Sequence, residues 1–581
     1  MAEVSPRSAD PSARSPPLPI RVTNKAIARH LRLAADLIEL TGGNAFRARA
    51  FGSAARTIER MDEPAAALAA EGSLTEVAGI GKGLADEIAA LVETGRLGVV
   101  AEILAVLPPG LLDVLRVKGL GPKKVRVLWQ ELDVTSLDAL EGAAVSGRIA
   151  ALSGFGKKTQ QNILEQVERL RTYAGKARYA DVYDEVDALL RAVRALPAVA
   201  RADVAGAFRR QMEVVEEIVV VAAGEAPALR EALAHLGLRV ETDGEVVARG
   251  HLPAGLPVRV LHAAPEGYGR TLWAATGSDQ HVEQFVHHAG MPGAARDEVT
   301  IYAAAGLPFI PPPLREGDGE VEAAAKNALP RLLTVEDLKG SLHNHTTASD
   351  GTDTLEEMVR AARARGFEYL GVCDHSQSLK IASGLSVDRL LAQIEEIHTL
   401  NARLEAEGVR FRVLTGTECD ILADGELDYP DEVLEKLDHV VASIHSLFKL
   451  GIAEQTRRLV RAVESGRVDI MGHLTGRLLL RRDGYRVDHE EVLAACAAHG
   501  VAVEVNANPY RLDLDWRWVR RAAEQGILIS INPDAHSTGE LDNDRWGVAV
   551  AQKGWLTPAQ CLNAKSADDL LAWLRARRAR S

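Results

Sequence analysis

Nine histidine, aspartate and glutamate side chains in the C-terminal part of the chain are of the types that bind transition metals. They are His343, His345, Asp350, His375, Glu418, His445, His473, Asp534 and His536. Mixed imidazole and carboxylate ligation favours Mn, Zn or Fe over Ca. A single histidine is more often a structural residue than a ligand, but nine such side chains that follow successive apolar segments indicate a metal site.

Each apolar segment that precedes these side chains is typical of a short β-strand, and helical sequence follows it. Seven candidate strands lie near residues 339–344, 369–374, 412–418, 439–445, 468–473, 501–507 and 527–533. Strands that alternate with helices predict a parallel α/β barrel. The side chains at the C-terminal strand ends then share one rim, where barrel enzymes place their active sites. In His343-Asn344-His345 both imidazoles converge, because alternate residues of a strand end point the same way.

Three short segments in the N-terminal part repeat glycine, an apolar residue, glycine and then a lysine at a helix start. The repeated residues are Gly79, Gly81 and Lys82, then Gly119, Gly121 and Lys123, then Gly154, Gly156 and Lys157. Such glycines let the backbone approach a phosphate, and the next helix offers unpaired N–H groups. One copy would be explained as well by a tight helix–helix turn with a glycine cap. Three copies favour phosphate contact over that explanation, and the segments resemble the helix-hairpin-helix motif, which implies DNA binding.

The sequence around the first repeat resembles the N-terminal 8 kDa domain of family X DNA polymerases. The resemblance rests on residues 24–97, including 43–51 and 54–59, and continues through a fingers-like segment to residue 173. Residues 306–317 are similar to the end of the bacterial thumb. The resemblance therefore covers the part of the chain that precedes the metal-type side chains.

The polymerase site that this resemblance implies has lost most of its residues. The family binds two metal ions with three aspartates, because the ions must hold both the attacking and the leaving oxygen. Glu217, Val219 and Arg259 stand at the matching positions, and Ala207 replaces the serine that binds the triphosphate. Valine cannot coordinate a metal, and arginine repels one. We expect DNA polymerase activity to be weak or lost, with the palm kept as a scaffold that positions DNA.

The C-terminal part resembles the PHP domain, named for polymerase and histidinol phosphatase, and fills all nine ligand positions of that family. The resemblance implies three divalent ions, Mn or Zn, with Fe as a further option. His343, His345, Glu418 and Asp534 would bind the first ion, Glu418, His445 and His473 the second, and Asp350, His375 and His536 the third. Such ions acidify a bound water, which then attacks phosphorus as hydroxide. Arg477 either steadies the phosphate or is a solvated loop residue.

The overall composition is that of a large globular protein. Hydrophobic residues make up 47% and charged residues 26% of the 581 residues, and no run approaches the roughly 18 apolar residues of a membrane span. The net charge of −13 does not exclude DNA binding, because residues 1–175 contain 22 Lys and Arg against 20 Asp and Glu. The four cysteines form no CxxC pair, which argues against disulfides. We expect a bacterial cytoplasmic, nucleoid-associated protein with no membrane partner.

The length and the changes in pattern predict a multidomain chain. We expect a flexible tail at 1–20, an 8 kDa-like helix-hairpin-helix domain at 21–97, a fingers-like helix-hairpin-helix domain at 98–173, a palm-like domain at 174–237, a thumb-like domain at 238–319, a linker at 320–338 and a PHP domain at 339–581. The expected fold class is therefore helical N-terminal domains, an α+β palm and thumb, and a distorted (β/α)7 barrel.

These observations favour a DNA-binding, repair-type protein with metal-dependent phosphodiesterase activity, most of all a 3′–5′ exonuclease in the PHP domain. The DNA would be gapped or present a 3′ end, and the sequence names no protein partner. One alternative is a small-molecule phosphatase of the histidinol-phosphatase type, although three phosphate-binding hairpins would then serve no purpose. Two others are a polymerase that still fills gaps and a DNA-binding scaffold, although a structural metal site seldom needs three ions and an open rim.

Overall fold

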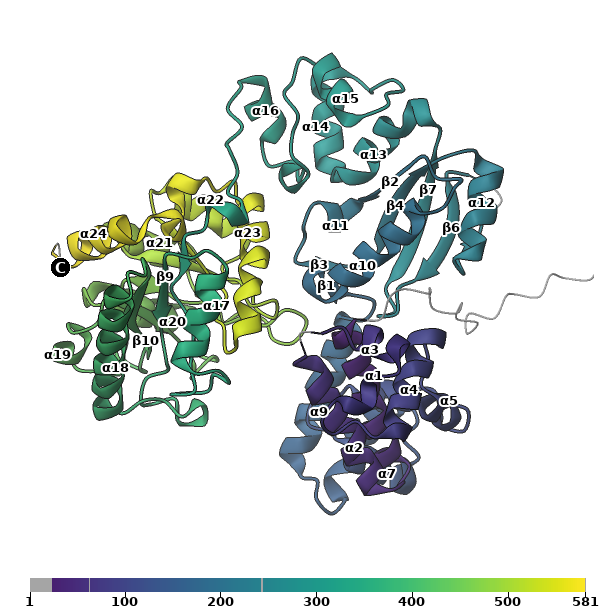
Figure 1. Cartoon of the computed structure of the whole chain (residues 1–581), viewed down its shortest axis with the longest axis horizontal. Coiled ribbons are helices and arrows are strands. Elements are labelled where there is room, and N and C mark those ends of the chain that lie inside the picture. The colour runs from purple at the N-terminus through teal and green to yellow at the C-terminus, as the bar shows by residue number, and fades with distance from the viewer. Residues whose placement is uncertain (1–22, 62, 242–243, 580–581) are drawn as a thin grey trace, which may run out of the picture. The chain divides into compact units, whose positions relative to one another are not determined.

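The computed structural model describes residues 23–61, 63–241 and 244–579, so the expected flexible tail at 1–20 lies outside the described residues. The first described part is built from helices (Figure 1). They are α1 (Asn24–Leu40), α2 (Ala45–Glu59), α3 (Ala65–Glu71), α4 (Lys82–Thr94), α5 (Gly98–Leu104), α6 (Leu111–Leu115), α7 (Pro122–Leu132), α8 (Leu137–Val145) and α9 (Lys157–Thr172).

Local sequence explains where the first of these helices begin and which face they bury. Thr23 caps α1 by accepting a hydrogen bond from Ala26 N at 3.2 Å, and Asn44 caps α2 through a 2.8 Å bond from Phe46 N. Ile27 and Leu31 lie one helical turn apart on α1 and are fully buried. They belong to one hydrophobic core that continues as far as α9.

A mixed α/β segment follows the helices. Its strands are β1 (Ala177–Arg178), β2 (Arg201–Ala205), β3 (Val214–Val215), β4 (Ile218–Ala223), β5 (Arg239–Val240), β6 (Val246–His251) and β7 (Pro257–Ala263), and its helices are α10 (Tyr179–Arg194), α11 (Gly206–Arg209) and α12 (Ala226–His235). Five strands form one sheet in the order β2-β4-β7-β6-β5, and β1 pairs with β3 in an antiparallel ladder. The palm-like sheet thus includes residues to 263, beyond the predicted boundary at 237, because β5 to β7 hydrogen-bond into it.

The thumb-like part consists of α13 (Tyr268–Thr276), α14 (Asp279–Ala289), α15 (Glu298–Ala304) and α16 (Glu320–Ala325). The predicted linker at 320–338 differs from the structure, because it begins with packed helix α16. Glu320 is fully buried, 2.6 Å from His281 Nδ1, and Val321 and Ala324 join the thumb core. Buried contacts therefore extend the thumb to α16.

The C-terminal part is a barrel of parallel strands surrounded by helices (Figure 1, green to yellow). The strands are β8 (Gly340–Ser341), β9 (Tyr369–Val372), β10 (Arg412–Asp420), β11 (His439–Ser443), β12 (Ile470–Met471), β13 (Ala502–Asn506) and β14 (Ile529–Asn532). They pair in chain order, and a parallel bridge between Asn344 and Ala535 brings the two edge strands together. The expected distorted (β/α)7 barrel is confirmed, with the seven strands near their predicted positions.

The helices of the barrel follow the strands as a parallel sheet requires. They are α17 (Leu355–Ala364), α18 (Val387–Ala406), α19 (Asp431–Leu434), α20 (Ile452–Glu464), α21 (His489–His499), α22 (Trp516–Glu524), α23 (Asp544–Lys553) and α24 (Ala567–Arg578). Strand β9 is buried along its whole length, and its sequence is continuously apolar up to the strand end. The change from apolar to ionisable residues marks the rim.

The chain divides into two compact units. Among the described residues, one comprises those of 23–176, 182–202 and 222–262, and the other comprises those of 177–181, 203–221 and 263–579. Two short segments of the palm-like part thus belong to the same unit as the barrel. Within that unit, Lys553 Nζ of α23 donates to Arg210 O at 3.1 Å. In the part of the chain that the structure describes, no helix is long and apolar enough to cross a membrane.

Candidate active site

Glu418, near the end of β10, is the centre of the predicted ligand set. Its Oε1 lies 2.8 Å from His473 Nε2 and 3.2 Å from His445 Nε2. Its Oε2 lies 2.8 Å from His375 Nδ1 and 3.4 Å from His343 Nε2. Glu418 is only 1% exposed, so both oxygens are committed to imidazoles in the interior. This is the arrangement of a carboxylate that can bridge two cations.

A second part of the cluster surrounds Asp350 and Asp534. Asp350 Oδ1 lies 3.3 Å from His536 Nε2 and 3.5 Å from His375 Nε2, and Asp534 Oδ1 lies 3.0 Å from His345 Nε2. The ligand atoms form three groups, and within each group all atoms lie within 4.8 Å of one another. The groups are His345, Asp350, His375 and His536; His343, His345 and Asp534; and His375, Glu418 and His445. With His473 held against Glu418, the barrel brings all nine predicted side chains together.

Two further carboxylates orient the imidazoles from outside the cluster. Glu504 Oε1 lies 2.7 Å from His343 Nδ1, and Asp420 Oδ1 lies 2.6 Å from His445 Nδ1. A proton on Nδ1 satisfies each acceptor and leaves the Nε2 lone pair facing the cluster. Sequence reasoning missed both residues. The available signals were an acidic residue inside the apolar strand β13 and a second one two positions after Glu418.

The donor set fits divalent cations. His343 Nε2 and His345 Nδ1 are buried and make no hydrogen bond within the described residues. Buried polar atoms are nearly always paired, so two orphaned imidazole nitrogens beside carboxylates need an explanation. Cations between the imidazoles and the carboxylates would complete both, because imidazole and carboxylate are ligands of Mn, Zn and Fe. The cluster is therefore a divalent-metal site by the chemistry of its side chains.

The pKa shifts of the cluster are of two kinds. Burial lowers the pKa of His343, His375, His445 and His536, but the carboxylates beside them outweigh burial and raise it above 6.5, so these histidines must lose a proton when a cation binds. Glu418 and His345 are shifted toward the forms that bind metals. Burial raises the pKa of Glu418, but His445, His375 and His343 outweigh burial and lower it well below 4.5. Burial, together with the neighbouring His375 and His536, lowers the pKa of His345 to about 4. Near neutral pH the carboxylate is thus charged and His345 is neutral, the forms that bind metals.

The backbone around the ligands is held in unusual conformations. Asp534 has φ of +51°, a left-handed conformation that is uncommon outside glycine. Asp374, directly before His375, holds the loop before Asp350. It accepts hydrogen bonds from Thr346 N at 2.9 Å and Thr346 Oγ1 at 2.7 Å. Side-chain contacts around the cluster therefore fix the positions of its loops.

Arg477 does not occupy the phosphate-steadying position that its sequence neighbourhood suggested. Its Nε donates to Arg511 O at 3.0 Å, Nη1 donates to Asp515 Oδ2 at 3.0 Å, and Nη2 donates to Leu512 O. All three guanidinium nitrogens of Arg477 are thus hydrogen-bonded to the segment that follows β13. Arg511 from that loop reaches the cluster instead, with its Nε 3.6 Å from Asp534 Oδ2. Arg477 follows His473 closely in the sequence, but this position did not predict where its side chain points.

The three glycine repeats adopt the same geometry. The first glycines, Gly79, Gly119 and Gly154, have φ of +86°, +92° and +81°, which explains glycine there. The second glycines, Gly81, Gly121 and Gly156, begin α4, α7 and α9 with φ of −81°, −78° and −142°, which any residue adopts. An added Cβ at the second glycines would meet no protein atom within 4 Å. Packing does not demand glycine there, whereas close approach by an outside partner does.

The palm-like positions lack a metal site. Val219 lies in β4 and is 4% exposed, Glu217 just before it is exposed, and Arg259 lies on β7. Ala207 lies in α11, where the resembled family has a serine. Among the described residues, the groups of three or more side chains that could hold a metal all lie in the barrel.

Arg209, the last residue of α11, and the next residue, Arg210, are directed into the thumb-like part. Arg209 donates to both carboxylate oxygens of Glu298, at 2.9 and 2.6 Å, and Arg210 Nε donates to Glu316 at 2.9 Å. Both carboxylates are largely buried, so these bonds tie the palm segment 203–221 to the thumb helices. They act as structural residues here.

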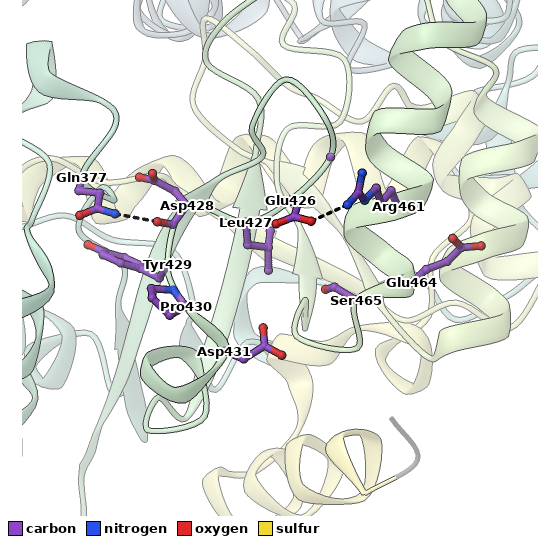
Figure 2. A pocket seen from close by; sticks show the side chains of 11 residues that line it. Gln377, Glu426, Leu427, Asp428, Tyr429, Pro430, Asp431, Arg461, Glu464 and Ser465 are labelled. Carbon is purple, nitrogen blue, oxygen red and sulfur yellow. Dashed lines mark hydrogen bonds and ion pairs between the residues drawn. The ribbon is translucent and has the colours of Figure 1, made fainter.

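A separate hollow of about 740 Å³ lies on the barrel (Figure 2). None of the nine cluster residues lines it. Gln377 Nε2 donates to Asp428 O at 2.9 Å, and Glu426 forms an ion pair with Arg461 across it. Asp431, also on its wall, is paired with Arg467 at 3.1 Å.

Comparison with protein families identifies the parts of the chain. Residues 22–97 match the helix-hairpin-helix domain, residues 111–169 match the SAM-like helix-hairpin-helix tandem, and residues 341–508 match the PHP domain. Each match lies within the segment in which the sequence predicted the corresponding domain, and the PHP match ends before Asp534 and His536.

Two kinds of relatives resemble the chain. The DNA polymerase/3′-5′ exonuclease PolX of Bacillus subtilis strain 168 is 34% identical over 582 residues, which cover 95% of this chain and 99% of the relative. A probable phosphatase of Thermoanaerobacter sp. strain X514 is 27% identical over 38% of this chain and 88% of its own length. A probable phosphatase of Vibrio atlanticus is 30% identical over 36% of this chain and 82% of its own length. The first kind spans nearly the whole chain.

Proposed function

Because this chain belongs to the bacterial family X DNA polymerases that carry a C-terminal PHP domain, we propose that it is a DNA-repair 3′–5′ exonuclease working through its PHP barrel. One observation carries the proposal: a complete imidazole and carboxylate cluster lies in the same chain as three helix starts whose glycines face open space. The Bacillus subtilis relative is named for both polymerase and exonuclease activities. Because Val219 and Arg259 stand where the family has metal-binding carboxylates, exonuclease activity is the one that remains for this chain.

The nine clustered residues would hold three divalent ions, Mn or Zn, with Fe as a further option. The ligand sets are His343, His345, Glu418 and Asp534; Glu418, His445 and His473; and Asp350, His375 and His536. Such ions supply Lewis acidity toward a phosphodiester and generate a nucleophile from water. Glu504 and Asp420 keep the proton of their histidines on Nδ1, so that Nε2 remains a ligand.

The helix-hairpin-helix repeats would hold the DNA. The open space at Gly81, Gly121 and Gly156 allows a phosphate to reach the first N–H groups of three helices, which have no side-chain caps. Contacts of this kind bind the backbone of any sequence, which suits gapped DNA or a 3′ end. The order of 8 kDa-like, fingers-like, palm-like, thumb-like and PHP domains and a cytoplasmic, nucleoid-associated location belong to the same proposal.

A small-molecule phosphatase is the second candidate, because two relatives named probable phosphatases match 38% and 36% of this chain. It gives the N-terminal helices no role, whereas the similarity to the Bacillus subtilis relative extends over 95% of the chain. A polymerase that still fills gaps would need metal ligands that Val219 and Arg259 do not provide.

The deciding experiment measures hydrolysis and DNA affinity separately. Replacing His343 with Ala should abolish hydrolysis of DNA and of a small phosphodiester, yet leave DNA affinity nearly unchanged. Replacing Gly81, Gly121 and Gly156 together with Val should weaken DNA binding while hydrolysis of the small diester survives. A Cβ at these glycines meets no protein atom within 4 Å and their φ values suit any residue, so we expect the triple variant to fold.

The hydrolysis rate is measured on duplex DNA at limiting concentration. Single-stranded DNA and a chromogenic phosphate monoester are measured in parallel. If the glycine variant digests DNA as well as the parent, the N-terminal part does not deliver substrate, and the phosphatase candidate gains. If the purified His343→Ala protein retains full nuclease activity, the assignment of the site is wrong.

A further inference from the structure

Arg511 is a positively charged residue of the barrel that lies beside the cluster of nine histidine and carboxylate side chains. Its guanidinium lies 3.6 Å from Asp534 Oδ2 through Nε, and its side chain is 19% exposed. Within the described residues its side chain forms no hydrogen bond, whereas the three nitrogens of Arg477 are all engaged. The terminal N–H groups of Arg511 are therefore available to an anion beside the cluster.

The loop that carries Arg511, residues 507–515, is held in place by two contacts from the palm-like part. The guanidinium of Arg178 in β1 lies over the ring of Tyr510, 3.4 Å from its centroid. Glu213, directly before β3, lies 3.7 Å through Oε1 from Arg477 Nη2, and Arg477 in turn donates to the carbonyl of Arg511. The two contacts act on neighbouring residues of one loop.

The two gripping residues form one small structural element. β1 pairs with β3 through Arg178 and Val214, and Tyr179 N donates to Glu213 O at 3.0 Å. Both belong to the segments 177–181 and 203–221 that form one compact unit with the barrel. Arg178 is 7% exposed and Glu213 is 8% exposed, so neither contact is a loose surface pair.

We propose that this β1/β3 element of the former polymerase palm is a working part of the nuclease, because it positions Arg511 to bind the phosphodiester that is cleaved. The inference rests on the proposed function. Glu213, Arg178 and Arg477 are positioning residues, and Arg511 contacts the substrate. A planar guanidinium suits a phosphate, because it donates two parallel hydrogen bonds. The element is retained although the polymerase carboxylates are gone, since the nuclease needs its other side chains.

The test measures metal-dependent hydrolysis of bis(4-nitrophenyl) phosphate and of an end-labelled DNA duplex by the full chain. Arg511→Met should lower kcat/KM for both substrates by about 10- to 100-fold with unchanged metal content, as expected for loss of a charged hydrogen bond. Arg511→Lys should recover part of the loss. Arg403→Met removes an exposed arginine of α18 paired with Glu356 and serves as the control that keeps full activity.

The role of the palm element is tested by combining substitutions. Glu213→Gln should lower kcat/KM by about 3- to 10-fold, mainly through KM, but should have no further effect in the Arg511→Met background, because both act through one contact. Glu231→Gln, at an exposed position of α12, is the matched palm control.

Three results overturn the inference: full activity of Arg511→Met, loss of metal from Arg511→Met, or an equal effect of Glu213→Gln with and without Arg511. If the parent hydrolyses neither substrate, the proposed function fails as well. If the parent is active and Arg511→Met matches it, only the present inference fails.

Discussion

Glu504 offers a sharp test of the metal centre, because every group around its carboxylate is a donor. His343 Nδ1 at 2.7 Å and Asn532 Nδ2 at 3.0 Å face Oε1. His473 N at 2.8 Å and Asn506 Nδ2 at 3.3 Å face Oε2. Glutamine has the same shape but only one oxygen, so Glu504→Gln must turn its NH2 group toward donors on one side.

Either orientation has a predictable effect. If the NH2 group faces His343, the imidazole proton moves to Nε2 and removes that lone pair from the cluster. Loss of such an outer partner typically reduces metal affinity about 10- to 100-fold, equivalent to about 1.4–2.8 kcal/mol. If the NH2 group faces His473 N, a buried donor loses its acceptor, which costs about 1–3 kcal/mol of stability. We expect the first effect to dominate the activity.

The assay is Mn²⁺ titration of the metal-depleted protein, followed by the rate of phosphodiester hydrolysis. The activation midpoint of Glu504→Gln should rise about 10- to 100-fold, with most of the rate recovered at saturating Mn²⁺. Glu405→Gln, at an exposed position of α18, should behave as the parent. A folded Glu504→Gln protein with the parent's midpoint would refute the reasoning that His343 depends on Glu504 for its ligand form.

Chelation by EDTA should abolish hydrolysis and lower the melting temperature, because the buried carboxylates and imidazoles lose their cations; an unchanged melting curve with full activity would exclude a metal requirement. Gap filling should be absent or very weak even with Mn²⁺, and Glu217→Asp, Val219→Asp and Arg259→Asp together should restore only part of it; rapid template-directed incorporation by the parent would contradict this. In the thumb, burial raises the pKa of Glu298, but its two arginine partners hold it below 4.5. Its stabilisation is therefore present above the unfolded pKa and lost as pH falls through the folded value. Glu298→Gln should lower the unfolding free energy by about 3–5 kcal/mol at pH 7 and by less near pH 3, and equal deficits in urea unfolding at both pH values would argue against the ion pairs.

The sequence predicted those features that depend on local pattern. The seven strands were recognisable because a parallel strand buried on both faces is continuously apolar, and the ligands follow where that run ends. His343 and His345 could be paired from their spacing alone. The glycine repeats were recognisable because Gly79, Gly119 and Gly154 have positive φ, which a sequence expresses directly as glycine. Similarity over nearly the whole chain then supported the expected family.

Tertiary structure decided what depends on contacts between distant segments. Arg477 stands close after a predicted ligand in the sequence, yet its guanidinium turns to the loop of Arg511, a residue with no signal of its own. Glu504 matters through a bond to His343, which is 161 positions away. The end of the palm-like sheet and the burial of α16 likewise follow from pairing and packing between segments. Local periodicity expresses which face of an element is buried, but it does not express which distant side chain meets that face. Only the folded chain therefore identifies Arg511, Glu504 and Glu213 as partners of the site.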